Sequence, residues 1–120
     1  MTDLRSLGMA IRSGELSPTE HVTDALDRLA ADPYNAVVTL DREGALAAAA
    51  ALTEELVRGR WLGPLHGVAL GVKDLIDVAG LPTRCGSNVL ADAPPAAADS
   101  PAVARLRAAG AVVVAKLHTQ

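Results

Sequence analysis

The two lysines of the chain stand where a solvated cation is not expected. Nine of the eleven basic residues are arginine, and the lysines, Lys73 and Lys116, each end an apolar run. If such a run is a buried strand, the lysine lies at its end, where burial favours a neutral amine that can accept a proton. Lys73 is therefore a candidate general base. The residues alone leave an ordinary role open, in which Lys73 extends to solvent or pairs with Asp74 or Asp77.

Familiar nucleotide-binding lysine motifs do not fit Lys73. The stretch "VALGVK" is similar to the kinase strand V-A-I-K, but that motif needs an upstream G-x-G-x-x-G loop. The upstream glycines here are Gly59, Gly63 and Gly67, at intervals of four. A P-loop lysine follows glycine and precedes Ser or Thr, whereas Lys73 lies between valine and aspartate. Neither motif supports a nucleotide-binding protein.

Metal and disulfide chemistry also find no support. Cys85 is the single cysteine, so neither an intrachain disulfide nor a cysteine metal cluster can form. We expect it to be a buried free thiol in a reducing compartment. The histidines are too scattered for a metal site, being His21, His66 and His118. The sequence therefore predicts no metal and no cofactor.

Composition narrows the classes of partner. The net charge is −3, and the aromatic residues are Trp61 and Tyr34 alone. Both features argue against nucleic acid, which calls for clustered basic residues and stacking platforms. The longest apolar run, Ala45 to Leu52, is far shorter than the roughly 18 residues of a membrane span. No signal peptide is visible at the start, so a cytoplasmic protein without membrane contact is expected.

Helical signals dominate the first half. Leu4, Leu7 and Ile11 predict one face of a helix over 3–13. The stretch Ser17-Pro18-Thr19-Glu20 is a capping box with proline at the first helical position, and Asp41 can cap a third helix running to about Arg58. The faces expected to be buried are Val22, Ala25, Leu26 and Leu29 in the second helix, and Leu46, Ala49, Ala50, Leu56 and Val57 in the third.

Strand signals predict an α/β fold. Residues 36–40, 67–72 and 111–115 are strand candidates, and the last two do not alternate, which suits strands covered on both faces of a parallel sheet. A helix from Ser100-Pro101 to 109 separates those two, so parallel pairing is expected. Lys73 would then lie at the carboxyl ends of the strands, where such folds bind ligands. The irregular stretch 79–98 is long enough to be functional.

Two blocks of the sequence resemble the amidase signature family. The stretch "GPLHGVALGVKDLIDVAGLPTRCGS", from Gly63 to Ser87, is similar to the family pattern G-P-L-H-G-[IV]-P-[IV]-x-[VL]-K-D followed by G-x-x-T-T-x-G-S. The later "DSPAVARLRAAGAVVVAKLHTQ" resembles the next block, which ends G-K-T-N-x-x-E-F. The helix start "SGELSPTEHVTDAL" also fits. The resemblance covers about Leu4 to Gln120.

This resemblance implies a partial amidase-signature fold, with N-terminal helices and the first buried strands of a mixed sheet covered by helices. Residues 1–120 would be the N-terminal part of one amidase domain, incomplete at its C-terminus. Residues 1–60 would form a mainly helical lead-in, and 61–120 the start of the catalytic α/β core.

The resemblance also implies a role for Lys73. It would be the lysine of a Ser-cisSer-Lys triad that hydrolyses a small-molecule amide through an acyl-serine, without metal, and it would have to lie inside to be neutral. The loop near Cys85, Gly86 and Ser87 is a candidate lining of the substrate cleft. Lys116 falls outside the triad and is expected to be structural.

The family's two serines lie in a Gly/Ser-rich stretch that residues 1–120 do not contain, so the chain is expected to supply the lysine but not the serines, and to be inactive alone. One alternative is a glutaminase like the A subunit of glutamyl-tRNA amidotransferase. Those subunits read K-D-N and T-T-C-A-S where this chain has Lys73-Asp74-Leu75 and 83–87 "TRCGS", which favours a stand-alone amidase. A non-catalytic truncated remnant is the other alternative. The sequence does not indicate an oligomeric state.

Overall fold

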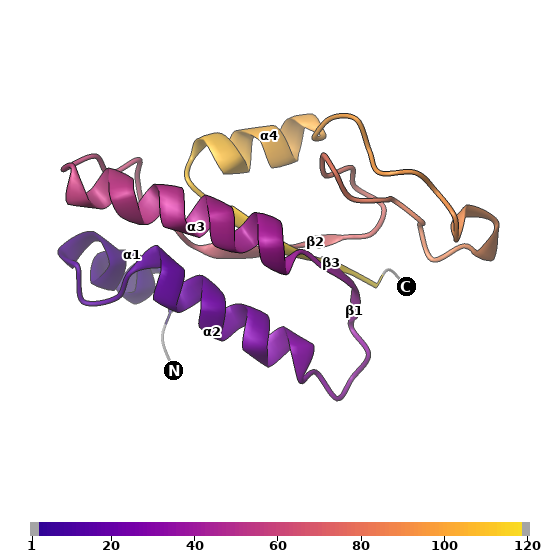
Figure 1. Cartoon of the computed structure of the whole chain (residues 1–120), viewed down its shortest axis with the longest axis horizontal. Helices are drawn as coiled ribbons and strands as arrows, with labels where there is room; N and C mark the ends of the chain where they lie inside the picture. Colours follow the sequence, from indigo (N-terminus) through magenta and orange to yellow (C-terminus); the bar gives the residue numbers. More distant parts are fainter. Residues whose placement is uncertain (1–2, 119–120) are drawn as a thin grey trace.

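The computed structural model describes residues 3–118, which form four α-helices, one 3-10 turn and a three-stranded sheet (Figure 1). In chain order the elements are α1 (Leu4–Ser13), α2 (Pro18–Ala30), β1 (Val37–Leu40), α3 (Arg42–Val57), β2 (Ala69–Lys73), η1 (Asn88–Leu90), α4 (Pro101–Ala108) and β3 (Val112–Leu117). These elements confirm the predicted α/β class.

Side-chain caps begin the helices where the sequence places them. The Ser17 hydroxyl accepts a hydrogen bond from the Glu20 amide, and the Glu20 carboxylate accepts one from the Ser17 amide, which completes the predicted capping box. Asp41 caps α3, and Ser100 caps α4. These contacts satisfy amides that have no partner inside the helix.

The sheet has the order β1-β3-β2, with β3 in the centre. β2 pairs with β3 in parallel, as predicted, and β1 pairs with β3 antiparallel. β3 is buried from Val112 to Lys116, whereas in β2 only Val72 is buried. The prediction that 67–72 is covered on both faces was therefore wrong, because β2 lies at an edge of the described sheet and Gly71 and Lys73 are exposed.

Helices cover the two faces of the sheet differently. One core cluster joins α2 and α3 to one face, and its buried members are Val22, Leu26, Ala45, Ala49, Val112, Val114 and Ala115. The other joins α4 and the segment after β2 to the opposite face, and its buried members are Val72, Val78, Leu81, Val103 and Val113. Figure 1 shows α4 above the strands and α2 below them, with α3 crossing in front.

A β-bulge changes which face β3 presents near its end. Leu70 of β2 pairs with Val113, but the next residue, Gly71, pairs with Ala115, so Val114 is an extra residue. The two residues at such a bulge point to the same side. Accordingly, Val114 and Ala115 both join the α2–α3 cluster. Strict alternation would have turned Lys116 toward α2 and α3, whereas the bulge turns it toward the α4 face.

Some predicted helical faces were wrong at their ends. Leu4 is 54 % exposed, whereas Ile11 of the same predicted face is buried, and Gly8 joins it in the interior. Val57 is 84 % exposed in the last turn of α3, beyond Leu52, which still packs against the α2–α3 core. Ala50 is exposed too, and Ala45 takes its place in the interior.

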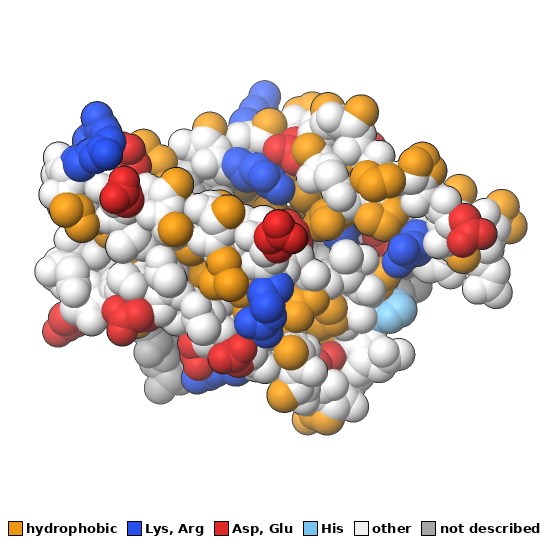
Figure 2. Space-filling view, viewed as in Figure 1, with side chains coloured by type: hydrophobic (Ala, Val, Ile, Leu, Met, Phe, Trp, Pro, Cys, Tyr) orange, Lys and Arg blue, Asp and Glu red, His pale blue; other side chains and the backbone are white. Residues whose placement is uncertain are grey.

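Acidic and basic side chains are interspersed over the face shown in Figure 2, without a large region of one sign. None of the helices within residues 3–118 combines the length and the apolar character that crossing a membrane requires.

Candidate active site

Lys73 is the last residue of β2, at the carboxyl end of the parallel strand pair, and it is exposed. Its neighbours Val72 and Asp74 are both buried, and successive side chains of a strand point to opposite faces. Lys73 therefore points to the α2–α3 face, where Leu117 is its register partner. Within residues 3–118 it forms no ion pair with Asp74 or Asp77, and the prediction that it lies inside was wrong for this chain.

Asp74, the next residue, is only 1 % exposed and is held from several sides. Its amide donates to the Leu117 carbonyl (2.8 Å), and its carbonyl accepts from the Cys85 amide (2.8 Å). Its carboxylate accepts from the Arg84 amide at 3.3 and 3.4 Å. Asp74 thus ties the end of β2 to β3 and to the loop that follows.

Lys116 completes this buried cluster. Its side chain is 0 % exposed, and its Nζ lies 3.1 Å from Asp74 Oδ1. The same nitrogen donates to the Pro82 carbonyl and to Thr83 Oγ1, each at 3.1 Å. An ammonium has three N–H donors, and each has one acceptor here. This arrangement agrees with the structural role expected for Lys116.

The loop that covers the pair is itself anchored. Thr83 Oγ1 donates to Asp77 Oδ1 (2.7 Å), and the Arg84 side chain donates to the Ala91 carbonyl (3.0 Å). Cys85 has a positive φ of 52° and is exposed. The prediction of a buried thiol was wrong, because this left-handed turn aims the Cys85 amide at Asp74 while the side chain stays outside.

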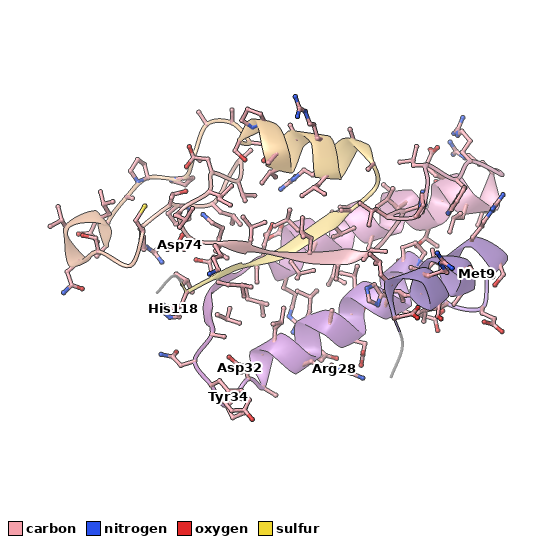
Figure 3. The ribbon with its side chains drawn as sticks, turned by 180° about the vertical axis from the view of Figure 1, so that it is seen from behind. Met9, Arg28, Asp32, Tyr34, Asp74 and His118 are labelled. Atoms are coloured by element: carbon pink, nitrogen blue, oxygen red, sulfur yellow. The ribbon has the colours of Figure 1, made fainter. Side chains whose placement is uncertain are left out.

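A pocket of about 230 Å³ lies beside this loop at the same end of the sheet. Its lining residues are Val38, Asp74, Arg84, Gly86, Ser87, Asn88, Ala91 and His118. Figure 3 shows Asp74 and His118 at this end. Gly86 and Ser87 therefore line this pocket, whereas Cys85 and Lys73 do not. Ser87 also caps η1, because its hydroxyl accepts a hydrogen bond from the Val89 amide.

Two histidines have backbone roles that the sequence did not reveal. His66 Nδ1 accepts from the Leu62 amide (3.1 Å), so its Nε2 carries the proton and donates to the Leu52 carbonyl (2.9 Å). His21 Nε2 accepts from the Ala69 amide at the start of β2 (3.1 Å). Burial lowers the pKa of His21, and nearby Asp24 partly opposes this. In the sequence, the only local sign of these backbone roles is the four-residue spacing of Leu62 and His66.

Within residues 3–118, no group of three or more His, Cys, Asp or Glu side chains is placed to hold a metal ion. The functional side chains at this end of the sheet include the exposed amine of Lys73, the buried Asp74–Lys116 pair, and the Arg84, Ser87 and His118 side chains that line the pocket.

Comparison with known sequences points to one family. The amidase family model matches residues 20–120. The A subunit of glutamyl-tRNA(Gln) amidotransferase from Salinispora arenicola is 44% identical over 98% of this chain. The corresponding subunit of Streptomyces coelicolor is 41% identical over 90% of it. The chain spans only 25% and 22% of the lengths of these relatives.

Solved structures agree with this result. A crystal structure of an amidase is 42% identical, with a TM-score of 0.86 over 99% of this chain and 27% of that one. The peptide amidase from Stenotrophomonas maltophilia is 38% identical, with a TM-score of 0.88 over 97% of this chain and 24% of that one. A fatty acid amide hydrolase, 22% identical with a TM-score of 0.84, shares the fold. The chain belongs to the amidase signature family and has the fold of that family's N-terminal portion.

Proposed function

We propose that the chain is the N-terminal segment of an amidase that hydrolyses a carboxylic amide C–N bond, with Lys73 as its catalytic base. One observation carries the proposal. The family match over residues 20–120 includes Lys73, which lies at the carboxyl end of a strand in a parallel pair. That is the edge of an α/β sheet where active sites gather.

The proposed reaction needs only acid–base and acyl chemistry. A serine hydroxyl attacks the amide carbonyl, and its proton passes through a second serine to the neutral amine of Lys73. The C–N bond then breaks, the leaving amine takes the proton, and water hydrolyses the acyl-serine. In this proposal both serines lie outside residues 1–120, so the chain alone is inactive.

The exposure of Lys73 is compatible with this role if other parts of a complete amidase cover it. Gly71 and Lys73 are the exposed residues of β2, and Leu75 just beyond is 56 % exposed. Covering this surface would remove water from the amine and favour its neutral form. Gly86 and Ser87, in the neighbouring pocket, are the residues we propose as part of the substrate cleft.

A glutaminase like the amidotransferase A subunit is the second candidate, because such subunits are among the most similar relatives. Leu75 after Lys73-Asp74 and the stretch "TRCGS" favour the stand-alone amidase. The two differ in substrate, so release of ammonia from glutamine against release from simple carboxamides separates them. A non-catalytic remnant would do neither.

A chimera tests the proposal. Residues 1–120 would replace the corresponding quarter of the Stenotrophomonas maltophilia peptide amidase, and the activity of the parent enzyme would be measured. We expect the chimera to be active and Lys73→Ala to reduce its kcat by at least about a thousandfold, since the base would be gone. Circular dichroism would verify that the variant folds. A folded Lys73→Ala chimera with near-parental activity would refute the assignment.

The matched control is the 120-residue chain alone, assayed for ammonia release from glutamine and simple carboxamides. No turnover is expected. Measurable turnover that is lost with Lys73→Ala would keep the base but show that the nucleophile lies within this chain.

A further inference from the structure

The Lys116–Asp74 pair is more elaborate than burial of a lysine requires. All three Nζ donors have acceptors, on the Asp74 carboxylate just after β2, on the Pro82 backbone and on the Thr83 side chain. Thr83 passes a further hydrogen bond to Asp77, whose carbonyl accepts from the Ser100 amide at the start of α4. One ammonium group therefore links the strand end, the covering loop and a helix.

The pair also determines the position of the residue before it. Asp74 directly follows Lys73 and is fixed at its amide, its carbonyl and its carboxylate. Because side chains alternate along β2, drawing Asp74 to the α4 face obliges Lys73 to project from the opposite face. The bulge at Val114 is what brings Lys116 to the α4 face to meet Asp74.

Stability alone does not account for such a pair. Replacing a buried ion pair by apolar side chains of similar volume is often neutral or stabilising. An apolar pair would fill the space, but it would make no directional hydrogen bonds to the Pro82 carbonyl and the Thr83 hydroxyl. The feature specific to this cluster is its directional hydrogen bonding.

We propose that Lys116 and Asp74 are positioning residues for Lys73, and that they hold the end of β2, which carries the base, in one fixed relation to the 82–87 loop. This inference rests on the proposed function, because it takes Lys73 to be the catalytic base. Neither Lys116 nor Asp74 touches the reacting atoms in this account, and each acts through the backbone of β2.

The test reads the surroundings of Lys73 without turnover, in the intact 120-residue chain. Because the chain has two lysines, acetylation by an amine-reactive reagent followed by mass spectrometry resolves each one. The Lys73 rate would be measured from about pH 6 to about pH 10, together with hydrogen exchange at the Asp74 and Cys85 amides. The variants are Lys116→Met and, should that fail to fold, Asp74→Asn.

Leu26→Ala is the matched control, because it weakens the α2–α3 core without touching this cluster. We expect Lys116→Met or Asp74→Asn to displace the pH profile of Lys73 and to speed exchange at Asp74 and Cys85 at least about tenfold more than in α2. Leu26→Ala should leave the Lys73 profile in place. An unchanged Lys73 profile in the first two variants, or an equal displacement in Leu26→Ala, would overturn the proposal.

These outcomes are separable from those of the activity test. If the Lys73→Ala chimera remains active, the function assignment fails while the positioning result stands. If the Lys73 profile does not depend on Lys116, the positioning role fails while Lys73 can still be the base.

Discussion

The two faces of the sheet each carry one lysine, and the surroundings of these two lysines are opposite. In the parallel pairing, Lys116 lies opposite Val72, one residue before Lys73, so both lysines are at the same strand ends. On the α4 face Lys116 is fully buried and its three donors have acceptors, whereas on the α2–α3 face Lys73 is exposed. Side-chain direction, not position along the sheet, separates the structural lysine from the candidate base.

Replacing each lysine in turn should produce the largest difference in the free energy of unfolding. Lys116→Met leaves the Asp74 carboxylate buried and without its cation, which typically costs about 3–5 kcal/mol in the free energy of unfolding. Lys73→Met, the same change on the other face, should alter it by less than about 0.5 kcal/mol. Urea unfolding followed by circular dichroism measures both.

The double variant Lys116→Met with Asp74→Leu sharpens this contrast, because it removes both charges. It should recover most of the stability lost in Lys116→Met alone. Similar losses for Lys116→Met and Lys73→Met would show that the two environments are not as different as described.

The two cores should also differ, by a smaller margin, in how much each contributes to the free energy of unfolding. Leu26 is 0 % exposed in the α2–α3 cluster, and Leu81 is 8 % exposed in the α4 cluster. Leucine-to-alanine changes in cores cost about 2–5 kcal/mol, depending on the cavity left. We expect Leu26→Ala to fall in the upper half of that range and Leu81→Ala at its lower end, measured by the same unfolding experiment. A larger loss for Leu81→Ala would reverse the ranking of the two faces.

The smallest expected effect is a pH dependence on the α2–α3 face. The pKa of His21 is below its ordinary value of 6.5, mainly because of burial. The unfolded chain therefore binds more protons than the folded chain between that lowered pKa and 6.5, so stability falls as the pH drops through this window. Protonation would also cost Nε2 its role as acceptor for the Ala69 amide.

A nuclear magnetic resonance titration of the three histidines, with His21→Gln as control, measures this effect. His21→Gln should flatten the loss of stability just below pH 6.5. A His21 midpoint at or above 6.5 would contradict the description of its surroundings.

Local signals made much of the fold predictable. The caps at Ser17, Asp41 and Ser100 depend on residues within four positions, and all three are present. The parallel pairing followed from two unalternating runs separated by a helix. The amidase signature resemblance was specific enough to give the family directly.

The direction of side chains at the site was not predictable in the same way. The bulge at Val114 depends on pairing between strands over 40 residues apart, so the sequence of β3 alone could not show that Lys116 faces Asp74. The exposure of Cys85 follows from a left-handed turn held by the Asp74 carbonyl. The exposure of Lys73 follows from the place of β2 at the edge of the sheet, which apolar composition does not reveal.

Competitive acetylation of the two lysines in the folded wild-type chain tests the central contrast most directly. Trace labelling at neutral pH, with the sites resolved by mass spectrometry and an unfolded sample as reference, gives both rates in one experiment. We predict that folding slows the acetylation of Lys116 at least about a hundredfold more than that of Lys73, because Lys116 can react only when the structure opens. Equal protection of the two lysines, or faster labelling of Lys116, would contradict the account.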